Sequence, residues 1–175
     1  MNIAIDIGHA NGTGAVGNGL EEHAVTSIIA PLLANRLRKS GHTVDIIDYP
    51  DKNNTDDLNA TVRAVNAGEY GLCISLHCDS ASTTEARGAH VCYTSPKGKE
   101  LAESIAWHLC PLLPGRADAT VRRTNLAILN QTRPVSVLCE CGFITNPGNA
   151  ALMQNNPDTI AKAIADGITD HINRQ

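Results

Sequence analysis

The sequence predicts an α/β fold: a single domain with a mostly parallel, twisted sheet of about five to six strands and helices on both faces. Short apolar runs bounded by turn residues alternate along the chain with segments of helical periodicity. The 175 residues contain no repeat, linker or low-complexity segment, and this length suits one domain with a full core. We therefore expect one domain that covers residues 1–175.

The first half of the chain has three predicted strands and two predicted helices. The strands cover 2–8, 44–48 and 72–76, and the helices cover 22–39 and 56–67. Apolar side chains at spacings of three and four give the first helix one apolar stripe. Pro31 lies inside this helix and should bend it or open a hydrogen bond. Asn54 or Thr55 is expected to cap the second helix.

The second half has three further predicted strands and two helices. The strands cover 88–94, 126–129 and 135–139, and the helices cover 97–112 and 157–172. The strand at 88–94 is a candidate edge strand. Pro114 and Gly115 end the first of these helices, and Pro157 follows Asn156, the expected cap of the second.

The composition excludes several classes of function. Formal net charge is −4, the basic residues are scattered and aromatic residues make up only 3% of the chain, so we expect no binding to nucleic acid. No stretch of about 18 apolar residues occurs, which excludes membrane insertion. The chain starts directly with a predicted strand rather than a signal peptide, which predicts synthesis in the cytoplasm.

The cysteines are expected to be structural. Most of the six lie inside apolar runs, where free thiols act as small buried hydrophobic groups. No Cys-x-x-Cys pair is present, so a zinc site built from cysteines is not expected.

Three predicted strands end in residues that can bind a metal or transfer a proton. His9 and His77 each close a strand, and Glu140 follows the apolar run that begins at Val135. The carboxyl ends of parallel strands share one edge of a sheet, where such folds place their functional sites. We therefore expect these three side chains to meet in one site. Imidazole is the commonest metal-binding side chain, so zinc is the leading candidate.

A catalytic zinc site has about three protein ligands and one open position. The third ligand should lie where the glycine-rich loop returns the chain towards His9, where the first helix begins with His23 and, just before it, the two acidic residues Glu21 and Glu22. Their residue types also suit simple stabilisation of a helix N-terminus.

The role of Glu140 is also open on residue type alone. It could be a fourth ligand or an acid–base catalyst, because a buried carboxylate requires a partner. A structural salt bridge to Arg63 or Arg133 is the alternative.

Five segments occur in an order that is informative. They are Ile5-Asp-Ile-Gly-His-Ala10, Gly19-Leu-Glu-Glu-His-Ala-Val25, Arg63 and Asn66 followed by Ile74-Ser-Leu-His77, Gly88-Ala-His-Val-Cys-Tyr93, and Leu126–Leu129 followed by Val137-Leu-Cys-Glu-Cys-Gly-Phe-Ile-Thr-Asn-Pro147. Together they resemble the motifs of the zinc-dependent N-acetylmuramoyl-L-alanine amidases found among bacterial cell-wall hydrolases and phage endolysins. The resemblance covers nearly the whole chain.

The resemblance implies zinc ligands His9, Glu22 and His77, with one zinc ion per chain, and Glu140 as the catalytic carboxylate. It implies hydrolysis of the amide bond between the lactyl group of N-acetylmuramic acid and L-alanine of the peptidoglycan stem peptide. The protein would reach its peptidoglycan substrate in the cell wall after release or export. Two alternatives stay open: a zinc peptidase of carboxypeptidase type, and a non-catalytic zinc-bearing module that binds the cell wall or has a regulatory role.

Overall fold

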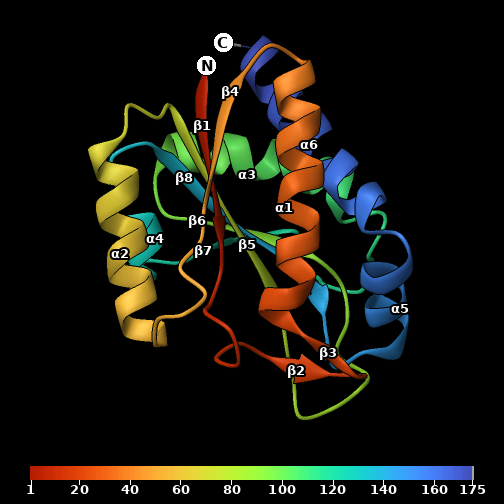
Figure 1. The fold of residues 1–175 in the computed structure, drawn as a ribbon. Coiled ribbons are helices and arrows are strands. Elements are labelled where there is room, and N and C mark those ends of the chain that lie inside the picture. Colours follow the sequence, from red (N-terminus) through yellow and green to blue (C-terminus); the bar gives the residue numbers. More distant parts are fainter. Residues whose placement is uncertain (175) are drawn as a thin grey trace.

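The computed structural model describes residues 1–174 and contains a six-stranded sheet with helices on both faces (Figure 1). The strand order is β4-β1-β5-β8-β6-β7. The strands are β1 (Asn2–Ile7), β4 (Thr43–Ile47), β5 (Leu72–Asp79), β6 (His90–Tyr93), β7 (Thr120–Arg122) and β8 (Val135–Phe143). All neighbouring pairs are parallel except β6 and β8. The predicted α/β class with a mostly parallel sheet is confirmed.

Six helices surround the sheet, and a short hairpin precedes the first of them. The helices are α1 (Glu22–Lys39), α2 (Asn54–Ala67), α3 (Pro96–Leu109), α4 (Ala127–Asn130), α5 (Pro147–Asn155) and α6 (Pro157–Asn173), and the hairpin is β2 (Val16–Gly17) and β3 (Leu20–Glu21). Within residues 1–174, none of the helices has the length and hydropathy needed to cross a lipid bilayer.

The two faces of the sheet are covered unequally. Helices α1, α3 and α6 bury one face under the main hydrophobic core, while α2 and the four-residue α4 cover the other (Figure 1). Leu76 and Cys139 point into the main core. Side chains alternate along a strand, so His77 and Glu140 point to the α2 face. These two predicted site residues therefore lie on the more thinly covered side.

Three predictions for individual elements are wrong. Residues 126–129 do not form a strand: Leu126 caps α4, whose Ile128 and Leu129 pack against the sheet. A four-residue apolar run has too little periodicity to separate a helix from a strand. The strand at 88–94 is not an edge strand, because β7 pairs with the outer side of β6. The cap of α2 is Asn53, whose side chain accepts a hydrogen bond from the Asp56 N–H, and neither Asn54 nor Thr55.

Helices α3 and α6 approach each other closely at Gly167. A Cβ atom there would lie 2.5 Å from the Cα of Ile105 and 2.8 Å from the carbonyl oxygen of Ser104. The Ser104 hydroxyl donates a hydrogen bond of 2.8 Å to the Gly167 carbonyl. Because the nearest atoms are backbone, a larger residue requires the two helices to separate.

We predict that Gly167→Ala lowers the free energy of unfolding by up to about 2 kcal/mol. Overpacking typically costs about 1–3 kcal/mol, which exceeds the gain of about 1 kcal/mol from alanine in a helix. Urea denaturation followed by circular dichroism measures the change. Gly148→Ala is the matched control, since Gly148 is an exposed helical glycine whose only close neighbour is the Asn146 side chain. Equal stability of the two variants would contradict the close-packing argument.

Candidate metal centre and catalytic site

His9, Glu22 and His77 converge at the carboxyl edge of the sheet. His9 follows β1, Glu22 opens α1 and His77 lies in β5. One ligand atom from each lies within 4.8 Å of the others, and no second group of three such ligand types comes together among residues 1–174. Residues separated along the chain by loops and a helix thus form one compact cluster.

The carboxylate of Glu22 is buried and held from several sides. Its Oε1 lies 3.0 Å from His77 Nδ1 and accepts a hydrogen bond of 2.9 Å from the Cys78 N–H. Its Oε2 accepts one of 2.7 Å from the Ala15 N–H and lies 3.5 Å from His9 Nε2. Glu21 points elsewhere, accepting a hydrogen bond from the Gly12 N–H. The structure therefore places Glu22, and not Glu21, beside both imidazoles.

Two glycines make this arrangement possible. A Cβ atom at Gly8 would overlap the imidazole of His77, and one at Gly14 would lie 2.8 Å from Glu22 Oε2. The glycine-rich loop thus lets side chains pack directly against the backbone.

His9 is oriented by a residue that the sequence did not indicate as functional. Its Nδ1 lies 2.8 Å from Asn54 Oδ1, which can only accept a hydrogen bond. Nδ1 therefore donates this hydrogen bond, which leaves Nε2, 3.5 Å from Glu22 Oε2, available as a metal-ligand atom. His9 adopts a φ of 64°, an uncommon conformation for a residue other than glycine. Asn54 was predicted only as a possible helix cap, and its residue type alone carried no signal for this contact.

The charges of the cluster are coupled. Burial acts to lower the pKa of His77, but its hydrogen bond to Glu22 and the nearby carboxylates raise that pKa to about 9. Burial acts to raise the pKa of Glu22, but the hydrogen bond and charge of His77 and two backbone N–H groups outweigh it and lower that pKa. The pair is held by strong mutual attraction, so a divalent cation would substitute for the proton on His77.

The donor set fits zinc. Two imidazoles and one carboxylate match the three-ligand sets of catalytic zinc sites, which leave one position for water or substrate. A hydrogen bond from the non-ligating nitrogen of a histidine, such as the one that His9 Nδ1 donates to Asn54 Oδ1, is typical of such sites.

Glu140 stands next to this cluster. It is the register partner of His77 across β5 and β8. Its Oε2 is buried without a hydrogen-bond partner in residues 1–174, and no ion pair joins it to Arg63 or Arg133. Burial raises the pKa of Glu140 to about 7, although the charge of His77 acts in the opposite direction. A carboxyl group with this pKa can both accept and release a proton near neutral pH.

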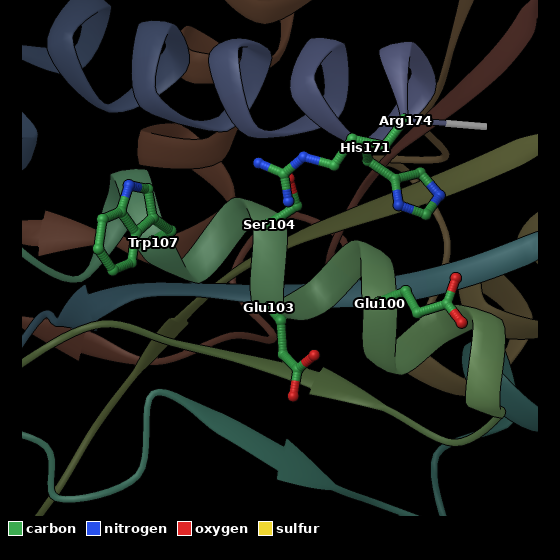
Figure 2. A pocket seen from close by; sticks show the side chains of 6 residues that line it. All are labelled: Glu100, Glu103, Ser104, Trp107, His171 and Arg174. Atoms are coloured by element: carbon green, nitrogen blue, oxygen red, sulfur yellow. The ribbon is translucent and has the colours of Figure 1, made fainter.

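A hollow in the protein surface lies between α3 and α6, away from these residues. It has a volume of about 470 Å³ and is lined by Glu100, Glu103, Ser104, Trp107, His171 and Arg174 (Figure 2). Figure 2 shows the side chains of His171 and Arg174 reaching from the end of α6 towards α3. None of the predicted site residues lines it, so this hollow is not part of the candidate site.

Comparisons with known proteins identify the family and the fold. The family described as N-acetylmuramoyl-L-alanine amidase matches residues 3–170. The solved catalytic domain of the CD27L endolysin targeting Clostridia Difficile is 31% identical with a TM-score of 0.89, covering 97% of each chain. The CwlD amidase from Clostridioides difficile shares the fold, with a TM-score of 0.88 at 21% identity over 99% of each chain.

Two curated relatives differ in how much of their own length this chain spans. The amidase LytC of Bacillus subtilis is 29% identical over 97% of this chain, which spans only 35% of LytC. YqiI of the same organism, an uncharacterized protein, is 28% identical over 97% of this chain and 84% of its own length. Because the family match covers almost all of the sequence, the chain belongs to the N-acetylmuramoyl-L-alanine amidase family.

Proposed function

We propose that the chain hydrolyses the amide bond between the lactyl group of N-acetylmuramic acid and L-alanine of the peptidoglycan stem peptide, and that residues 1–175 form the catalytic domain. The observation that carries this proposal is the cluster of His9, Glu22 and His77 with Glu140 beside it, in a member of this family. The protein would act on the cell wall after release or export.

His9, Glu22 and His77 would hold one zinc ion. A bound zinc ion would act as a Lewis acid there, which would polarise the scissile carbonyl group and lower the pKa of a water molecule. The chain contributes fixed ligands: two backbone N–H groups hold the Glu22 carboxylate and Asn54 holds the His9 ring. Little reorganisation is then required before the reaction.

Glu140 would accept a proton from the attacking water and deliver it to the leaving nitrogen. A pKa of about 7 supports both transfers, because the group is neither a strong acid nor a strong base. The free Oε2 of Glu140 also supports this role, since a buried carboxylate with a structural purpose normally has a partner.

Product analysis tests the proposed reaction. The protein loaded with about one zinc ion per chain should release intact stem peptides with a free N-terminal alanine from purified cell wall, detected by mass spectrometry. Chelation should abolish release, and added zinc should restore it. Cleavage within the stem peptide would instead indicate a peptidase of carboxypeptidase type, and zinc binding without any product would indicate a non-catalytic module.

Glu140→Gln should lower the rate of hydrolysis by about 10²–10⁴-fold, because the amide cannot accept the water proton. Elemental analysis should still find zinc, and circular dichroism should show an unchanged fold. Glu69→Gln is the control, since Glu69 is exposed and lies before β5, at the opposite edge of the sheet. A wild-type rate for Glu140→Gln would remove Glu140 from the mechanism.

Asn54→Ala should weaken zinc affinity by about 10–100-fold, the usual effect of losing a hydrogen bond to a ligating histidine. A chelator competition assay measures it, and Asn54→Asp should retain most of the affinity because it keeps the acceptor.

The neighbouring Asn53→Ala separates this effect from helix stability. Asn53 is the cap of α2, so its loss should lower stability by about 1 kcal/mol and leave zinc affinity unchanged. Equal zinc affinity of Asn54→Ala and wild-type protein would show that Asn54 does not orient His9.

A further inference from the structure

A second pocket adjoins the cluster on the α2 face of the sheet. It has a volume of about 120 Å³, enough for several water molecules, and His9 and His77 form part of its wall. The other lining residues are Asp6, Gly8, Asn54, Asp57, Leu58, Thr61, Ser75, Leu126, Ala127, Ile128 and Leu138. The pocket thus combines two carboxylates and two hydroxyls with an apolar wall contributed by α2, α4 and β8.

The Thr61 hydroxyl in this pocket has no hydrogen-bond partner within residues 1–174, and neither has one oxygen of the Asp57 carboxylate. Asp57 is the charged group of the two. It is only 4% exposed, and its Oδ1 is buried without a hydrogen-bond partner in residues 1–174. The neighbouring Asp6 is satisfied, because its Oδ2 accepts a hydrogen bond of 2.6 Å from the Ser75 hydroxyl. A buried carboxylate without a partner is strongly unfavourable, so Asp57 is available to bind a ligand that enters the pocket.

The pocket is negative. Burial raises the pKa of Asp57 to about 6, and the charges of Asp6 and Asp48 add to the shift. Asp57 is therefore still mostly ionised at neutral pH. Asp48 has its own partner in His23, at 2.9 Å. The imidazole of His77 in the pocket wall is paired with Glu22, at 3.0 Å, and no lysine or arginine lines the pocket. These charges favour a cationic occupant.

The occupant is not a second metal ion. The two carboxylates do not join a third ligand in a coordination-sized group, since His9, Glu22 and His77 are the set that meets this condition in residues 1–174. An organic cation fits better, because its hydrogen-bond donors can reach Asp57 while its carbon atoms contact Leu58, Ile128 and the rest of the apolar wall.

We propose that this pocket binds the amino end of the released stem peptide, with its ammonium group on Asp57 and its alanine methyl group against the apolar wall. This rests on the proposed function. In hydrolysis the C–N bond breaks, the water oxygen joins the carbonyl carbon to form a carboxylate, and both water protons end on the nitrogen. A neutral amide N–H thus becomes an ammonium ion beside a negative pocket.

The position of the pocket suits this role. His77 lines the pocket and is also the register partner of Glu140 across β5 and β8. A nitrogen protonated from Glu140 therefore develops its positive charge next to a wall of the pocket. Asp57 would stabilise that charge in the transition state and in the product more than it stabilises the neutral substrate, which is the condition for a contribution to catalysis.

Binding of two small probes tests the proposal without any turnover. L-alanine methylamide carries the free ammonium group, and N-acetyl-L-alanine methylamide is its neutral counterpart. Calorimetry or NMR titration at pH 7 should show that wild-type protein binds the amine at least about tenfold more tightly than the acetylated probe, as expected for a charge-assisted hydrogen bond. Asp57→Asn should lose this preference, whereas the exposed Asp51→Asn should keep it.

Two further measurements separate the possible explanations. The preference should persist in metal-free protein, because the amine is held by Asp57 and not by zinc; a preference that requires zinc and survives Asp57→Asn would overturn the proposal. Thermal denaturation should show that Asp57→Asn does not lower the melting temperature, since it removes a buried unpaired charge.

Equal binding of both probes to wild-type protein would mean that the pocket holds only water, and would also overturn the proposal. A chain that cleaves no cell wall yet prefers the amine through Asp57 would refute the amidase reaction while leaving the cation pocket in place, so the two failures can be told apart.

Discussion

The site depends on the placement of one buried carboxylate, that of Glu22. It joins the loop that precedes β2, the end of β5 and the start of α1, because backbone N–H groups of Ala15 and Cys78 both donate to it. With those donors in place the carboxylate stays ionised despite its burial, and both imidazoles lie within reach of it. A shift of this loop would withdraw one donor and leave a buried charge poorly satisfied, so the loop and the candidate metal site are energetically linked.

The sheet supplies the second constraint. Its main-core face is apolar and lies under three helices, so strand register is strongly fixed there. The same register sets the partners on the opposite face, where His77 meets Glu140. Polar side chains on that face, including Ser75 and Asp6, sit under the thinner cover of α2 and α4. Apolar packing on one side thus positions chemistry on the other.

Strand ends were predictable from the sequence, and contacts made by loops were not. His9, His77 and Glu140 follow apolar runs, and a parallel sheet brings the ends of such runs to one edge. The choice of Glu22 over Glu21 depended on resemblance, since adjacent carboxylates at a helix start differ only in where the preceding loop places them. Asn54 had the residue type of a helix cap, and its neighbour Asn53 took that position instead. The short α4 was mistaken for a strand because four apolar residues carry almost no periodicity.

The two carboxylates without partners share one explanation. Glu140 and Asp57 both lie on the α2 face, are both shielded from solvent on one oxygen, and both have a raised pKa caused chiefly by burial. Each is unfavourable for folding at neutral pH, because ionising a buried acid is harder in the folded chain than in the unfolded one. The extensive apolar core on the opposite face offsets this penalty. Such strain is expected where a protein keeps groups ready for a ligand rather than for its own stability.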